Sequence, residues 1–122
     1  MKGGLRMKIR VIKNKIIPLK GFAAITIWPF IFTKIDMRTT DINHETIHCE
    51  QQLEMLILPF FLWYVVEWLI RLLLYRNFYE AYRNISFEQE AYLNQHNTWY
   101  VTERSHFAWV KYLTRKTFRK VS

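Results

Sequence analysis

Two histidines in this sequence are separated by one turn of a predicted helix. The stretch DINHETIHCEQQLEM, residues 41–55, contains His44, Glu45 and His48, and the whole chain of 122 residues has only four histidines. Residues i and i+4 of a helix lie on one face, so both imidazoles can reach a common point. Glu45 is rotated by about 100° from His44, which keeps it beside that point but out of direct contact. The pattern predicts a zinc site in which Glu45 takes a proton from metal-bound water.

A catalytic zinc ion takes three protein ligands and keeps one position for water, so a third ligand must come from elsewhere. Glu54 lies on the wrong face of the same helix. The later stretch ISFEQEAYLNQ offers Glu88 as the predicted ligand, with Glu90, which points about 160° away, in reserve. The residues that follow the helical face of Glu88 are Asn84, Tyr92, Gln95 and Trp99. The alternative is a pair of solvated helix faces that bind no metal.

The motif H-E-x-x-H, followed on a later helix by Glu88-Gln-Glu-Ala-Tyr92, resembles the gluzincin clan of zinc metallopeptidases. The size of the chain and its order of strands before helices are similar to the minigluzincins, the single-domain members of that clan. The resemblance covers the layout of about residues 20–100, but only some ten residues by identity. It implies that His44, His48 and Glu88 hold zinc, that Glu45 is the general base, and that a peptide substrate pairs as an extra strand with a sheet edge formed by AAITIW or FIFTK.

Tyr92 departs from the family pattern, because many gluzincins have there an Asp that binds a zinc-ligating histidine. That supporting role falls in this sequence to Tyr92, Asn84 or Gln95. The negatively charged oxygen formed during peptide hydrolysis also needs a hydrogen-bond donor besides the metal. The candidates for this donor, among which the sequence does not choose, are His96, His106, Tyr92 and Arg104.

The elements that must position these residues follow from the periodicity of the chain. MKIRVIKNKII alternates apolar and basic residues as a strand does, and FAAITIWPFIFTKI is a second strand-like run. Pro29 in that run predicts an edge, a bulge or a bend between two short strands. Helices are expected over about residues 41–58, 59–76, 85–97 and 105–118. We therefore predict an α+β fold, with a short N-terminal antiparallel β-ribbon followed by a bundle of about four helices, in one domain over residues 1–122.

The net charge of +8 is concentrated at the two ends of the chain. Residues 1–20 contain seven Lys or Arg and residues 111–122 contain five, with no acid in either segment. Such ends are compatible with an anionic membrane surface as partner, although we prefer the ordinary alternative of solvated basic ends, and the absence of a nucleic-acid-binding motif argues against nucleic acid. The basic segment 1–20 is also the candidate plug of a latent enzyme. The single Cys49 excludes an internal disulfide, and no convincing signal peptide is present, so we expect a cytoplasmic protein, or one peripheral to the membrane.

Residues 56–75, LILPFFLWYVVEWLIRLLLY, are long and apolar enough for a transmembrane helix, with Glu67 and Arg71 as their charges. A straight span would place His48 and Glu88 on opposite sides of a bilayer, which conflicts with a shared zinc ion. The segment is therefore a core helix, a helix in the plane of the interface, or a helix that bends back. We prefer the core helix.

The interpretation that joins these features is a small zinc metallopeptidase that hydrolyses peptide bonds. A first alternative is a membrane-surface or interaction module whose metal site is structural or absent. A second alternative keeps zinc hydrolysis but acts on lipid-linked amides or esters, which the aromatic residues 60–82 would suit. The sequence indicates neither the substrate nor the oligomeric state.

Overall fold

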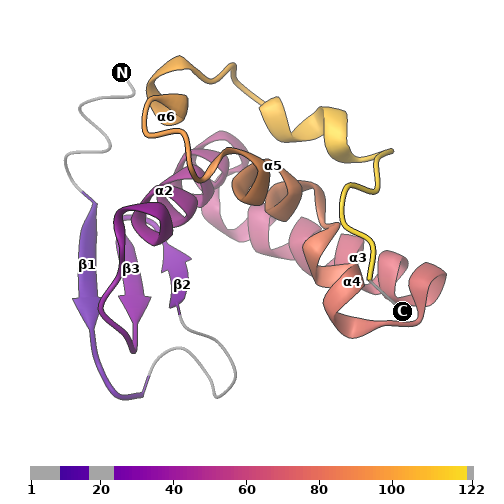
Figure 1. Ribbon diagram of the computed structural model, residues 1–122, viewed down its shortest axis with the longest axis horizontal. Coiled ribbons are helices and arrows are strands. Elements are labelled where there is room, and N and C mark those ends of the chain that lie inside the picture. The colour runs from indigo at the N-terminus through magenta and orange to yellow at the C-terminus, as the bar shows by residue number, and fades with distance from the viewer. Residues whose placement is uncertain (1–8, 17–23, 121–122) are drawn as a thin grey trace.

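The computed structural model describes residues 9–16 and 24–120, in which a three-stranded sheet precedes five α-helices and a 3₁₀ helix (Figure 1). This confirms the predicted α+β class, although two short α-helices are unexpected and the helix expected over 105–118 is not an α-helix. The strands are β1 (Arg10–Lys13), β2 (Ala24–Ile27) and β3 (Phe30–Thr33). The helices are α2 (Thr39–Met55), α3 (Ile57–Tyr75), α4 (Phe78–Arg83), α5 (Ser86–Asn94), α6 (Tyr100–Glu103) and the 3₁₀ helix η1 (Ala108–Tyr112).

The sheet has the strand order β1-β3-β2 and is mixed. Strands β2 and β3 form the expected antiparallel hairpin, and Pro29 lies in the bend between them. Strand β1 runs parallel to β3, so the prediction of a wholly antiparallel ribbon is wrong for this pair. Side chains alternate in the same way in parallel and antiparallel strands, so the pattern predicts a strand but not its direction. Apart from residues 9–16, which include β1, the segment 1–20 predicted to act as a plug lies outside the described residues.

Helix α2, which contains both histidines, begins beside a local polar contact and ends at a sharp corner. The carboxylate of Asp41 accepts hydrogen bonds from the backbone N–H of Arg38 at 3.0 Å and from its side chain at 3.2 Å, which stabilises the first turn. The helix ends at Met55, and the next residue, Leu56, has a φ of 62° in the left-handed region. Helix α3 starts at Ile57, with Pro59 in its first turn, where no backbone donor is lost.

The C-terminal part of the chain differs most from the prediction, because η1 and extended backbone replace the helix expected over 105–118. Side chains of the domain bind this backbone. The guanidinium of Arg71 donates to the carbonyls of Tyr112 and Leu113, and Asn84 accepts from the N–H groups of two residues that follow. The N–H groups of Thr117 and Phe118 donate to Asn84 instead of to the carbonyls of a preceding helical turn, so tertiary contacts override the local helix pattern.

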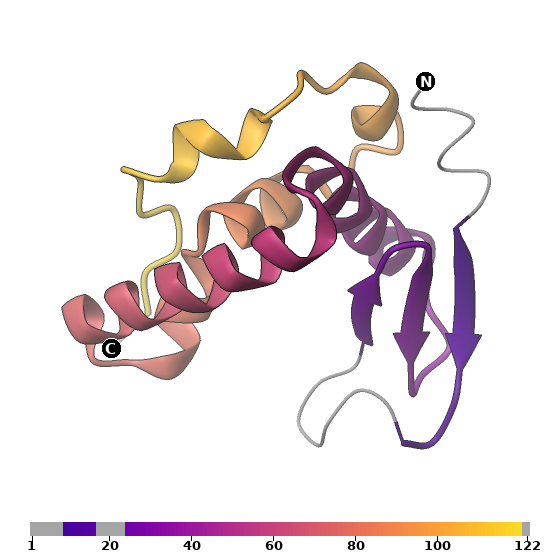
Figure 2. The same cartoon turned by 180° about the vertical axis from the view of Figure 1, so that it is seen from behind.

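Helix α3 extends along one side of the molecule, and Figure 2 shows it with no described element in front. Its buried residues are Phe60, Glu67 and Arg71. Leu58 is 70% exposed and Leu73 is 79% exposed. The helix is long and apolar enough to cross a membrane by length and composition, yet only 17% of its most apolar window is buried. The preferred interpretation as a core helix is therefore wrong, because most of its apolar surface faces outward.

Candidate metal centre

The two histidines of α2 face Glu88 of α5 at the centre of the molecule. The Nε2 atoms of His44 and His48 each lie 3.1 Å from Oε1 of Glu88. All three residues are buried, and one ligand atom from each lies within 4.8 Å of the others. The small side chain of Ala91 packs against Ile47 between the two helices, which lets them approach closely. The structure thus brings together the three residues that the sequence predicted as metal ligands.

Glu90, the reserve ligand, is not part of this group. Its carboxylate accepts hydrogen bonds from Arg104 Nε at 2.7 Å and from the Tyr100 hydroxyl at 2.6 Å. Arg104 also binds Glu54, so one buried guanidinium lies between two buried carboxylates. Helix α5 therefore directs Glu88 to the histidines and Glu90 to an arginine on its other side.

Two glutamines fix which nitrogen of each imidazole faces Glu88. The Nε2 group of Gln51 donates to the Phe87 carbonyl and to Glu90, so its oxygen is the atom that faces Nδ1 of His48, at 2.7 Å. The oxygen of Gln95 lies 2.7 Å from Nδ1 of His44. A glutamine oxygen only accepts, so each Nδ1 holds a proton. In a neutral ring, each Nε2 then presents a lone pair to the carboxylate of Glu88.

This donor set fits a divalent cation, since two imidazole nitrogens and one carboxylate oxygen are ligands that zinc prefers. Lone pairs 3.1 Å apart repel unless a positive charge lies among them. A proton can take that place: burial disfavours the charged ring, but the Glu88 carboxylate outweighs burial and raises the pKa of His48 to about 9. Burial alone would raise the pKa of Glu88, but the two imidazoles hold it well below its usual range. The site favours positive charge.

Two tyrosines complete the surroundings of the ligands. The Tyr64 hydroxyl on α3 donates to the second oxygen of Glu88 at 2.6 Å, which orients that carboxylate. The ring of Tyr92 contacts the ring of His44 edge to face, with centroids 4.5 Å apart. Of the three residues expected to support a histidine, Gln95 makes the hydrogen bond, Tyr92 packs on the ring, and Asn84 instead binds the C-terminal segment.

Glu45 lies outside the ligand group, as expected, and its carboxylate accepts a hydrogen bond from the Thr26 hydroxyl of β2 at 2.7 Å. Glu45 and His44 line an open cleft of about 820 Å³. Helices α3, α4 and α5 contribute an aromatic and apolar wall to the cleft, with Tyr64, Val65, Trp68, Phe78, Tyr79, Tyr82 and Tyr92. The ligands, the base and the space for a substrate therefore occur together.

Of the four candidate oxyanion donors, Tyr92 alone lines the cleft. Burial raises its pKa to about 12, so its hydroxyl stays protonated at neutral pH and can donate. His96 is exposed beyond Gln95, and the His106 side chain is 71% exposed beside Glu54. Arg104 is held between its two carboxylates. Glu54 and Glu90 thus hold Arg104 outside the cleft lining, Glu54 contacts His106, and His96 is exposed without being part of the lining.

The sequence reasoning missed Gln51 and Tyr64 as supports of the ligands. Gln51 lies three residues after His48, a spacing at which helical side chains meet, so this contact could be predicted from the sequence. Tyr64 belongs to the polar stripe of the apolar helix, but its approach to Glu88 depends on packing between distant segments.

Comparisons of the chain with protein-family models, with curated proteins and with solved structures find no match. The resemblance to gluzincins thus remains one of motif. The arrangement of side chains around His44, His48 and Glu88 is what supports a function for this site.

Proposed function

We propose that this protein is a small zinc-dependent hydrolase of peptide bonds. The observation that supports it best is the convergence of His44, His48 and Glu88 beside an open cleft whose wall contains the carboxylate of Glu45. A buried N, N, O donor set is compatible with a structural ion as well, but a structural zinc site is usually closed by a fourth protein ligand. Within the described residues no fourth His, Cys, Asp or Glu joins this group.

Each residue of the cleft has a role that follows from its contacts. A bound zinc ion would supply a Lewis acid that makes water acidic at neutral pH. Glu45 accepts the proton and returns it to the leaving amine, while the hydroxyl of Thr26 orients the carboxylate of Glu45. Gln51 and Gln95 hold the imidazoles in one tautomer. Tyr92 is the candidate donor to the developing negative oxygen.

Strand β2 is the edge on which a peptide would pair. The alternative edge, FIFTK, is excluded because β3 lies at the centre of the sheet with a partner on each side. Gln52 already binds the carbonyl of Thr26 and the N–H of Trp28. Backbone groups alternate between the two edges of a strand, so the same edge presents the N–H and carbonyl of Ala24, which lines the cleft.

The test is a zinc measurement on the purified full-length protein combined with mass spectrometry of a random peptide pool, with and without a chelator. We expect stoichiometric zinc and chelator-sensitive cleavage. His48→Ala should lose both. Glu45→Gln should retain zinc and lose at least about a thousandfold in cleavage rate, since an essential acid-base group is removed.

His106→Ala is the matched control, because it removes a histidine that contacts Glu54 outside the cleft, and it should behave as the unaltered protein. Bound zinc without cleavage of any peptide would contradict the peptidase and leave either a structural site in an interaction module or a hydrolase of lipid-linked substrates. Absence of zinc from folded protein would contradict the metal centre itself.

A second candidate keeps the ion and the base but takes a lipid-linked amide or ester as substrate. The observation that favours it is the aromatic and apolar wall of the cleft, which includes Val65, Trp68 and Phe78. Cleavage of an acylated amide by the same preparation, with the peptide pool left intact, would select this candidate.

A further inference from the structure

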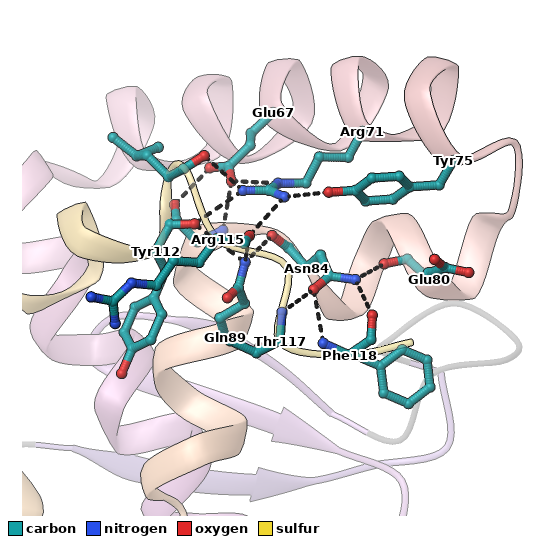
Figure 3. Close-up of polar contacts among 12 residues, drawn as sticks. Glu67, Arg71, Tyr75, Glu80, Asn84, Gln89, Tyr112, Arg115, Thr117 and Phe118 are labelled. Atoms are coloured by element: carbon teal, nitrogen blue, oxygen red, sulfur yellow. Dashed lines mark hydrogen bonds and ion pairs between the residues drawn. The ribbon is translucent and has the colours of Figure 1, made fainter. Parts of the chain in front are cut away.

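Helix α3 turns its polar side chains toward the protein body. Arg71 donates to Glu67 at 2.9 Å and to the Tyr75 hydroxyl at 2.7 Å, and Glu67 accepts from the Ser86 hydroxyl at 2.6 Å. Figure 3 shows these side chains on the inner side of α3, bonded to the backbone of the C-terminal segment around Tyr112. The charges of the helix are thus satisfied inside the molecule.

The opposite side of α3 is apolar and exposed. The large apolar residues that are at least 41% exposed on this helix are Leu58, Leu62, Trp63, Val65, Val66, Leu69, Ile70, Leu73 and Leu74. We call these nine residues the outer face. A helix of a soluble protein normally has the reverse arrangement, with its apolar stripe toward the core. A continuous apolar surface of this size marks contact with another molecule or with lipid.

Basic residues border the outer face at one end. Arg76 caps α3 and is exposed, and Arg115 is exposed in the segment whose backbone binds Arg71 of α3. Arg119 and Lys120 are exposed further along the same segment, after the residues that bind Asn84. The two acids in this region are already neutralised, Glu67 by Arg71 and Glu80 by Lys116. An apolar groove of about 820 Å³ lies between the outer face and residues 113–116, with Arg115 and Lys116 in its lining. Apolar surface beside uncompensated positive charge is complementary to a bilayer that contains anionic lipids.

A second copy of the chain is a poorer occupant of this surface. Of its ten acidic residues, seven form ion pairs within the chain, namely Asp36, Asp41, Glu54, Glu67, Glu80, Glu88 and Glu90. Few carboxylates therefore remain to meet the basic border. Phosphate groups of lipids offer that charge together with acyl chains for the apolar residues.

We propose that the outer face of α3 docks the protein on an anionic membrane surface, with the helix in the plane of the interface. The middle of α3 binds Ser86 and the backbone of Tyr112 and Leu113. If α3 crossed the bilayer, these polar segments of the protein would have to enter the bilayer as well. In the plane, the leucines enter the acyl region while Arg76 and Arg115 meet phosphates.

The test is sedimentation of the full chain with vesicles of phosphatidylglycerol and phosphatidylcholine, or of phosphatidylcholine alone. We expect binding to the anionic vesicles that weakens as salt rises, and at least tenfold weaker binding to neutral ones. The double substitution Leu69→Glu and Leu73→Glu should reduce vesicle binding at least tenfold. Both side chains are exposed, so the protein should still fold, as circular dichroism can verify.

Leu93→Glu on α5 is the matched control, since Leu93 is also exposed, at 55%, but lies outside the outer face. It should bind vesicles as the unaltered protein does. Equal binding by the double variant would overturn the assignment of the face, and equal binding to neutral vesicles would overturn the recognition of anionic lipid. A stable dimer that ignores vesicles would overturn the proposal in favour of a second copy. None of these measurements depends on zinc or on hydrolysis.

Discussion

Helices α2 and α3 are consecutive in the chain and opposite in character. Helix α2 is polar overall, and even its buried side is mostly polar. Six of its eight buried residues are polar: Asn43, His44, His48, Glu50, Gln51 and Gln52. Helix α3 is strongly apolar, yet two of its three buried residues are the charged pair Glu67 and Arg71. Both helices bury polar groups, but α2 presents them to a common point and α3 uses them to hold the C-terminal segment.

This difference separates two reasons for a polar interior. A buried polar group is unfavourable unless it has partners. In α3 the partners are complete within the chain, because Arg71 donates to a carboxylate, a hydroxyl and three backbone carbonyls. In α2 the two imidazoles and Glu88 satisfy each other only with an added positive charge. The metal-free protein can supply a proton there, and a divalent ion meets the same demand.

The largest expected effect is that of zinc binding at the histidines of α2 on the stability of the protein. Zinc should stabilise the folded protein by about 4 kcal/mol when its concentration is a thousand times its dissociation constant, since it binds the folded state. Thermal unfolding with zinc and with chelator measures this difference. His48→Ala should abolish the zinc-dependent shift, whereas His96→Ala should keep it, because His96 is exposed outside the ligand group. A shift that survives His48→Ala would mean that zinc binds elsewhere.

A second prediction contrasts one substitution on each helix. Gln51→Leu should lower the free energy of unfolding by about 2 to 3 kcal/mol, because it leaves His48 Nδ1 without its buried acceptor and removes one buried hydrogen bond each from the Phe87 carbonyl and from Glu90. Leu73→Gln should change it by less than about 0.5 kcal/mol, because Leu73 is 79% exposed. Urea unfolding of both variants gives the comparison. If both variants lose the same free energy of unfolding, the outer face must be covered in solution.

A third prediction concerns the support of one ligand. Gln95→Ala removes the acceptor that lies 2.7 Å from Nδ1 of His44 and should weaken zinc binding by about 10 to 100-fold. Competition with a chromophoric chelator measures the affinity. Gln95→Glu retains an acceptor at this place and should recover most of the loss. If Gln95→Ala binds zinc as tightly as the unaltered protein, the hydrogen bond does not fix the ring.

The metal-free protein should also lose stability as the pH rises. His48 has its pKa raised from 6.5 in the unfolded chain to about 9 in the folded protein, mainly by Glu88 against the opposing effect of burial. A raised pKa gives stability that is fully present below pH 6.5 and is lost as the pH passes 9. The change between pH 6 and 9.5 is about 3 kcal/mol. Urea unfolding with chelator between pH 6 and 9.5 measures it, and His48→Ala should remove most of the slope.

The sequence predicts what depends on local spacing. The shared face of His44 and His48, the place of Glu45 beside it and the direction of Glu88 all follow from helical geometry, and the structure agrees with each. It does not predict contacts between distant segments. Arg104 and His106 were candidates for the cleft because they are polar, but Glu54, fifty residues or more away in sequence, binds both.

The same limit explains the errors in the fold. The pattern of residues 105–118 resembles a helix, but side chains from α3 and α5 bind that backbone instead. The apolar composition of α3 was interpreted as a core, because burial is the usual place of such residues. Whether an apolar helix packs inside or outside depends on which of its faces the rest of the chain covers, and composition does not contain that information.

The smallest expected effect is on the cleavage rate of a membrane-tethered peptide, which depends on both α2 and α3. Val65 belongs to the outer face of α3 and also lines the cleft that contains His44 and Glu45. If the outer face rests on a membrane and the centre hydrolyses peptides, the cleft opens next to the lipid surface. A peptide tethered to anionic vesicles should then be cleaved several-fold faster than the same peptide free in solution, because both are held at one surface.

The design separates the two proposals on which this last effect depends. The variant with Leu69→Glu and Leu73→Glu should cleave the free peptide at the ordinary rate and lose the advantage of the tethered one. Glu45→Gln should bind vesicles normally and cleave neither. A tethered peptide that is cleaved more slowly than the free one, by protein that does bind the vesicles, would show that docking turns the cleft away from the lipid. The outer face of α3 would then be an anchor unrelated to substrate choice.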